Sequence, residues 1–259
     1  MANGTSRLAG TALGRGDARN PSTAEPAAQR VFRELRNAIV TMALTPGQAL
    51  SEAEIAARIG VSRQPVREAF IKLSEAGLLR VRPQRGTFVV KISTKQVTDA
   101  RFVREAVEIA VVRHACESLR TADIANLEEL IEAQRESAAD QKPARFLALD
   151  EAFHRALAIG VGCDYAWRVV EEVKAQMDRV RYLSLPHATP IERLVDQHAA
   201  ILSAVKARNA AAAENAMRVH LSEILASLPV LERQYPELFE TEPEAASAAA
   251  PQPMEHVGA

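Results

Sequence analysis

The hydrophobic pattern of residues 27–90 changes its period partway along, and this change limits what the segment can fold into. Residues 27–42 carry Val31, Leu35 and Ile39 at helical spacing, and two shorter helical patterns follow at residues 51–60 and 62–76. From Leu79 onward apolar and basic residues alternate, and a turn signal, "PQRG", precedes the apolar-rich "TFVV". Three helices followed by a hairpin predict a winged helix, with residues 51–76 as its helix-turn-helix.

The polar face of the third predicted helix is basic. Arg63 and Arg67 stand one helical turn apart with Gln64 beside them, and like charges at this spacing weaken an isolated helix. The pattern is explained if an anion or a guanine edge supplies the missing partner, because arginine can bond guanine through two nitrogens. The alternative is a solvated helix with incidental arginines. The hairpin adds polar side chains placed to contact phosphates or a minor groove: Arg82, Gln84 and Arg85.

Charge is divided unevenly along the chain, although the formal net charge of the 259 residues is only −1. Residues 29–91 contain 11 Lys and Arg against 5 Asp and Glu, whereas residues 95–240 contain 18 against 23. A basic segment ahead of an acidic one indicates an anionic partner for the first segment alone.

The stretch "LSEAEIAARIGVSRQPVREAFIKLSEAGLLRVRPQRGTFV" resembles the N-terminal domain of the GntR family of bacterial transcription regulators. The resemblance implies that four side chains enter the major groove of DNA and that the wing around Gly86 reaches the minor groove. One departure is Ala53, where many members of the family carry an arginine, so one expected DNA contact is absent. The four major-groove residues implied are Ser62, Arg63, Gln64 and Arg67.

The second half of the chain is helical by pattern. Six apolar stripes at helical spacing lie near residues 95–118, 121–139, 142–160, 164–185, 190–208 and 210–228, and no strand signal interrupts them. Thr189, Pro190 and Glu192 predict a capped helix start. The fold class predicted for the whole chain is mainly α: a winged helix-turn-helix followed by an all-α helical bundle.

Four polar residues within these helices form a candidate metal site. Asp150 and His154 stand at i and i+4, which places them on one helix face, and His198 and His220 lie within two later helices. Each histidine alone is more often hydrogen-bonded than ligating, and a polar core network without metal is the alternative. Imidazole and carboxylate ligands without thiolate suit a divalent zinc, nickel, manganese or iron ion, and the sequence does not choose among them.

The same residues resemble the FCD-type effector domain of GntR regulators. The resemblance implies that Asp150, His154, His198 and His220 hold a divalent metal inside the bundle, and that Arg104 points into an effector cavity where it would clamp a carboxylate. A surface ion pair between Arg104 and Glu108 is the alternative. Less direct candidates for the cavity are Arg179 and Arg181. Three histidines have no place in the pattern: His114, His187 and His256, the last two being expected in exposed segments.

Composition sets the domain limits and the compartment. Two cysteines, no apolar run near 18 residues and no signal pattern predict a cytoplasmic protein without a disulfide framework or a membrane span. Residues 1–25 and 241–259 are predicted to be a disordered arm and tail. Residues 26–92 are predicted to form the DNA-binding domain, and residues 95–235 the domain for effector, metal and dimerisation.

The resulting hypothesis is a ligand-responsive transcription regulator, on family precedent a repressor. It would bind palindromic double-stranded operator DNA as a homodimer and respond to a small organic or sugar acid. One alternative is a direct metal sensor, in which the ion itself is the signal. Another is a metal-dependent hydrolase or lyase, against which the sequence offers no H-E-x-x-H or G-x-S-x-G motif, so we predict that the protein is not an enzyme.

Overall fold

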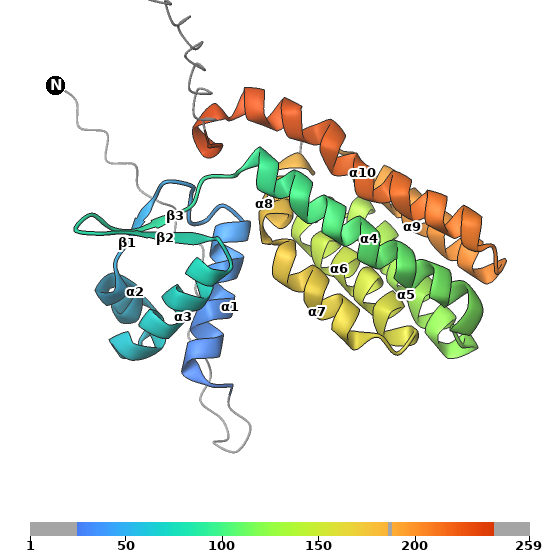
Figure 1. The fold of residues 1–259 in the computed structure, drawn as a ribbon, viewed down its shortest axis with the longest axis horizontal. Helices are drawn as coiled ribbons and strands as arrows, with labels where there is room; N and C mark the ends of the chain where they lie inside the picture. The colour runs from blue at the N-terminus through green and yellow to red at the C-terminus, as the bar shows by residue number, and fades with distance from the viewer. Residues whose placement is uncertain (1–24, 186–187, 241–259) are drawn as a thin grey trace, which may run out of the picture.

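The computed structural model describes residues 25–185 and 188–240. A small domain of helices and a three-stranded sheet lies beside a larger bundle of helices, with the short helix α8 at the end of the bundle that faces α1 (Figure 1). The predicted fold class, a winged helix-turn-helix followed by an all-α bundle, is confirmed. The predicted arm and tail, His187 and His256 lie outside the described residues, apart from Glu25.

The first domain is built from three helices and a wing. Its elements are α1 (Ala27–Val40), β1 (Ala49–Leu50), α2 (Glu52–Ile59), α3 (Arg63–Glu75), β2 (Leu79–Arg82) and β3 (Gly86–Val89). Ser51 caps α2 by accepting a hydrogen bond from the backbone N–H of Glu54, as the capping-box spacing predicts. The two-residue strand β1, which the sequence did not indicate, pairs antiparallel with β3 and gives the sheet order β1-β3-β2. Leu35, Phe70 and Leu73 pack in the core that joins the helices to the sheet.

The backbone conformation of the wing turn places its polar side chains in solvent. Arg82 and Gly86 are register partners in the β2–β3 hairpin, and the N–H of Arg85 donates to the carbonyl of Arg82 (3.0 Å). Pro83 restricts the chain at the start of the turn, and Gln84 follows with a φ of 60°. The guanidinium of Arg82 lies 5.3 Å from the centre of the Phe88 ring, which holds this side chain against the hairpin.

In the described residues of the second domain, 94–185 and 188–235, there are seven helices rather than the six predicted. They are α4 (Thr94–Ser118), α5 (Thr121–Ala139), α6 (Pro143–Gly160), α7 (Asp164–Val173), α8 (Ala175–Ser184), α9 (Ile191–Lys206) and α10 (Ala210–Gln234). The predicted helix of residues 164–185 breaks at Lys174, whose ammonium group contacts Glu151 on α6 and Asp178 on α8. The bundle is assembled by α10 packing on α4 and α9, and by α5 packing on α6 and α9.

One predicted helix cap and one predicted helix end are wrong. The helix near residue 190 begins at Ile191 after Pro190, and Thr189 makes no side-chain cap. The last helix does not end near residue 228. It continues through Pro229 to Gln234, because the fully buried Leu231 packs against Ile92 and Phe239 in a small core beyond the proline. Burial there outweighs the backbone hydrogen bond that proline removes.

A short 3-10 helix, Pro236–Leu238, returns the chain to the junction of the two domains. Ile92, in the connection between β3 and α4, forms a parallel bridge with Phe239, and Arg80 on β2 pairs with Glu240 (3.2 Å). Among the helices that the structure describes, none is long and apolar enough to cross a membrane.

We expect that Phe153→Ala lowers the free energy of unfolding by about 3–5 kcal/mol, because it opens a cavity in the bundle core. Phe153 is 0% exposed and its ring stacks on His198 with centroids 4.4 Å apart. Urea denaturation measures the loss. The matched control is Tyr165→Ala on α7, where the ring is 69% exposed and the change should be at most about 1 kcal/mol. Equal losses in both variants would contradict the placement of Phe153.

Candidate functional sites

The basic surface predicted to bind DNA is carried by α3 and the wing. Helix α3 begins at Arg63 after the N-cap Ser62, and its apolar stripe, Val66 to Leu73, is buried against α1 and α2. The opposite face is therefore left for a partner. All eight predicted DNA contacts are exposed: Ser62, Arg63, Gln64, Arg67, Arg82, Gln84, Arg85 and Gly86.

Helix α2 supplies a carboxylate partner for the two arginines of α3. Glu52 lies 3.3 Å from both Nε and Nη2 of Arg67, and 3.7 Å from Nη2 of Arg63. Arg63 and Arg67 therefore have a partner within the protein, which the sequence analysis did not identify. Both arginines are mostly exposed, and ion pairs of this kind contribute about 0–1 kcal/mol, so Glu52 holds them loosely.

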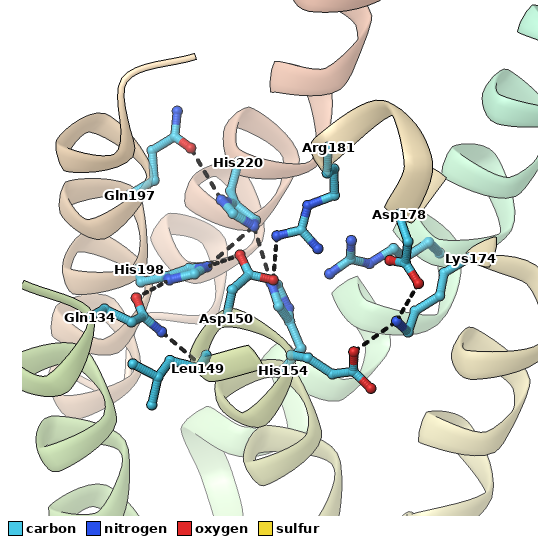
Figure 2. Close-up of polar contacts among 12 residues, drawn as sticks. Gln134, Leu149, Asp150, His154, Lys174, Asp178, Arg181, Gln197, His198 and His220 are labelled. Carbon is cyan, nitrogen blue, oxygen red and sulfur yellow. Dashed lines mark hydrogen bonds and ion pairs between the residues drawn. The ribbon is translucent and has the colours of Figure 1, made fainter. Parts of the chain in front are cut away.

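A second cluster lies deep inside the bundle. Asp150 and His154 on α6, His198 on α9 and His220 on α10 are all buried, and one ligand atom from each lies within 4.8 Å of the others. Figure 2 shows the three imidazoles around the carboxylate of Asp150. Nε2 of His220 lies 3.0 Å from Nε2 of His154 and 3.3 Å from Nε2 of His198, and the latter is 3.5 Å from Oδ1 of Asp150. Such a cluster could hold a metal ion.

Hydrogen bonds on the far side of each imidazole fix its tautomer. Nδ1 of His198 faces Oε1 of Gln134 (2.7 Å), and the amide of Gln134 is oriented because its Nε2 donates to the carbonyl of Leu149 (3.1 Å). Gln197 plays the same part for His220: its Oε1 lies 3.1 Å from Nδ1 of His220, while its Nε2 donates to Glu223 (3.0 Å).

The third imidazole is oriented by a carboxylate. Nδ1 of His154 donates to Glu108, which as an ionised group can only accept. Burial would raise the pKa of Glu108, but Arg104 and His154 lower it to about 2. All three Nδ1 atoms therefore carry a proton, and in the neutral form of each imidazole the Nε2 lone pair points toward the other two rings.

The charges inside the cluster are set by burial and by one arginine. Burial lowers the pKa of His198 to about 3 and also lowers that of His220, so both stay neutral at pH 7. Burial alone would raise the pKa of Asp150, but Arg181 and the imidazoles hold it well below its usual range. Arg181 pairs with Oδ2 of Asp150 outside hydrogen-bond geometry, and neither oxygen of Asp150 has a hydrogen-bond partner among the described residues.

Arg104, which the resemblance predicts to face an effector cavity, is buried and already paired. It is 3% exposed, lines the same interior region as His220, and its Nε donates to Glu108. The pairing that we considered as a surface alternative therefore forms, but inside the protein. A small cavity of about 30 Å³ adjoins the cluster, lined by Arg104, Met177, Arg181, Leu194, His220 and Ile224.

Several residues that orient the cluster were not identified from the sequence. Glu108 had been considered only as a partner of Arg104, and neither Gln134 nor Gln197 was singled out. The one available signal was position: Gln197 precedes His198, and Gln134 lies on the inward stripe of its helix with Leu127 and Ile131. Arg181, a minor candidate, contacts Asp150 directly, whereas Arg179 is buried and bonds Gln176. His114 lies at the surface near Glu117.

The winged helix beside a helical domain with a buried Asp/His cluster defines a class of bacterial DNA-binding regulators. The sequence model of the bacterial regulatory proteins of the gntR family matches residues 27–89, and that of the FCD domain matches residues 99–223. The chain belongs to the GntR family and carries an FCD domain. It is therefore a DNA-binding regulator of transcription and not an enzyme.

Relatives of known name and structure agree with this assignment. The HTH-type transcriptional repressor RspR of Escherichia coli K12 is 42% identical over 223 residues, which cover 86% of this chain and 97% of RspR. An HTH-type regulator in an unstable DNA locus of Streptomyces ambofaciens is 37% identical over 212 residues, covering 82% and 89%. A GntR regulator of Rhodococcus sp. RHA1 superposes with a TM-score of 0.64 at 27% identity, covering 79% and 97%. Escherichia coli McbR/YncC shares the fold, with a TM-score of 0.69 at 21% identity and coverage of 82% and 100%.

We expect Arg67→Ala to weaken binding to the cognate duplex, obtained by selection from a random pool, by about 1–3 kcal/mol if this guanidinium reads a base. Fluorescence anisotropy on cognate and random duplexes measures the difference. The comparison variant is Arg85→Ala on the wing, which should weaken both duplexes alike and reduce the salt slope by about one. Equal losses on both duplexes for Arg67→Ala would make Arg67 a phosphate contact.

Proposed function

We propose that the protein is a ligand-responsive repressor whose bundle holds a divalent metal ion and a small carboxylate effector. Its operator would be a palindrome bound by a homodimer, since half-sites related by a two-fold axis match two identical winged helices. Repression is supported by the name of the relative RspR. A second copy of the chain could bind where Phe102 on α4 and Val219 on α10, two neighbouring helices, expose apolar side chains.

The observation that carries the metal proposal is the direction of the three lone pairs. With every Nδ1 donating outward, neutral imidazoles have no proton to share between Nε2 atoms that lie 3.0 and 3.3 Å apart. This arrangement is repulsive unless a cation accepts the lone pairs. Asp150 brings an anionic oxygen without hydrogen-bond partners to the same point, and Glu108, Gln134 and Gln197 supply the outward hydrogen bonds that metal-binding histidines require. The set suits zinc, nickel, manganese or iron.

Charge balance supports an anionic effector. Around the cavity Arg104 and Arg181 are offset by Glu108 and Asp150, while Glu223 at the rim pairs with Arg193 (3.1 Å). A divalent ion would leave this buried region with two uncompensated positive charges. A carboxylate would neutralise part of that charge, and arginine binds carboxylates well. When bound, the metal would supply an electrostatic contact for the acid.

The direct metal sensor remains the second candidate, because the lone-pair argument concerns the ion and not the acid. The two proposals differ in one respect. For a metal sensor, operator affinity follows metal occupancy and is indifferent to acids. For an acid sensor the metal is resident, and operator affinity follows the acid at constant metal occupancy.

We expect purified protein to contain about one divalent ion per chain and His220→Ala to lose it, because removing one of three imidazoles leaves an incomplete ligand set. Elemental analysis after gel filtration measures the content. The matched control is His114→Ala on the surface, which should keep the ion. Gln134→Leu, which removes only the partner of His198, should weaken metal affinity by about 10- to 100-fold. Full occupancy in His220→Ala would refute the four-ligand assignment.

We expect a small organic or sugar acid to raise the melting temperature of the metal-loaded protein and to change its operator affinity. An acid at a hundred times its dissociation constant adds about 2.7 kcal/mol of stability. Linkage requires operator DNA to change the affinity for the acid by the same factor. Thermal unfolding and anisotropy measure the two effects, and chelating the metal should abolish both. An acid that binds without altering operator affinity would contradict the repressor proposal.

A further inference from the structure

The structure points to Arg181, rather than Arg104, as the residue that an acid effector engages, and to α8 as the element that carries its response to the DNA-binding domain. This inference rests on the proposed metal and acid response. It names the residue that contacts the acid and the helix that links the acid site to the DNA-binding domain.

The charge of Arg104 is already committed. Its Nε donates to Glu108, and Glu108 in turn accepts from Nδ1 of His154. Pulling Arg104 toward an acid would leave the buried Glu108 uncompensated and would release the tautomer of His154. A buried charge left without its partner is strongly destabilising.

Arg181 is also paired, but its partner Asp150 belongs to the proposed metal site. Nη2 of Arg181 is buried without a hydrogen-bond partner among the described residues, and both oxygens of Asp150 are in the same state. Nη2 of Arg181 forms an ion pair with Oδ2 of Asp150, and Asp150 is the carboxylate that a metal ion would share. Once a cation lies against Asp150, the guanidinium of Arg181 needs a second anion. Arg181 also lines the cavity beside His220, so an acid bound there would lie within its reach (Figure 2).

The cavity is too small for an organic acid as it stands. Its volume of about 30 Å³ accommodates about two water molecules. An acid therefore has to displace part of the lining. Two of the lining elements, α4 and α10, are 25-residue helices packed on each other, whereas α8 has ten residues and contributes Met177, Arg181 and Ser184 to the cavity wall. Of the helices that line the cavity, α8 makes the fewest contacts with the other helices of the bundle.

Helix α8 also contacts the winged-helix domain directly. Asp178 pairs with Arg36 on α1 (3.0 Å), and Nε2 of Gln176 donates to the carbonyl of Gly77 at the end of α3 (3.0 Å). Ala175 packs into the core of the winged-helix domain. The contacts of α8 with the winged helix and its contact with Asp150 lie within seven residues of one another. A shift of Arg181 therefore changes the position of α3, the helix that carries Arg67.

The test uses full-length protein loaded with Zn²⁺ and a probe panel of acetate, lactate, malonate and gluconate. Calorimetry gives acid affinity, elemental analysis gives zinc content, and anisotropy gives operator affinity with and without acid. Arg181→Gln should retain zinc and bind the responsive acid about 30-fold more weakly, the loss typical of removing one partner of a buried charge pair. Arg113→Gln, at an exposed arginine of α4, is the matched control and should behave as wild type.

Arg36→Gln tests the transmission separately. Arg36 lies on α1, so this variant should keep zinc and acid affinity while the ratio of operator affinities with and without acid falls toward one. If Arg181→Gln does not fold, Arg181→Lys keeps a positive charge beside Asp150 but loses the planar fork, and it should still weaken the acid about tenfold.

Three results overturn the inference. Wild-type acid affinity in both Arg181 variants removes Arg181 from the site, and an unchanged operator response in Arg36→Gln removes α8 as the route. In either case the proposed repressor function stands. A wild-type protein that keeps zinc but responds to no acid in the panel overturns both this inference and the acid half of the proposed function, while the metal site is judged by its own measurement.

Discussion

Three imidazole Nε2 atoms converge in the interior of the bundle, and much of the surrounding structure fixes their orientation. The chain brings α6, α9 and α10 together so that His154, His198 and His220 converge, and it surrounds them with acceptors that hold each Nδ1 proton outward. Buried lone pairs that face one another are unfavourable unless something positive lies among them. The proposed metal ion meets this requirement. It would also explain why polar side chains are buried in a core that is otherwise apolar.

Two adjacent residues of α6 connect this interior to the rest of the protein. Asp150 faces the imidazoles and Arg181, whereas Glu151 turns away and pairs with Lys174 at the break between α7 and α8 (3.0 Å). Lys174 also pairs with Asp178, which reaches Arg36 of the winged helix. Helix α6, which contributes two residues to the cluster, therefore forms one ion pair just before α8 begins, at Lys174, and another within α8, at Arg181. The ten residues of α8 therefore contact both the charged cluster and the DNA-binding domain.

The sequence by itself determined the winged helix, the helical second domain and the identities of the four clustered residues. These features depend on local spacing: a period of 3.6 followed by alternation for the winged helix, and one helical turn between Asp150 and His154. Resemblance to known regulators extended the set to His198 and His220. Spacing within a helix survives folding unchanged, which explains why predictions of this kind succeed.

Only the tertiary structure decided which charges meet. Glu52 is 15 residues from Arg67 in the chain, Gln134 is 64 from His198, and Asp178 is 142 from Arg36, yet each pair is in contact. The break at Lys174 and the continuation of α10 through Pro229 likewise depend on what packs beside them rather than on the local sequence. An ion pair is a contact in space, and its partners are fixed by the packing of separate helices. The pairing of Arg104 with Glu108 and of Arg181 with Asp150 could therefore be established only from the folded chain.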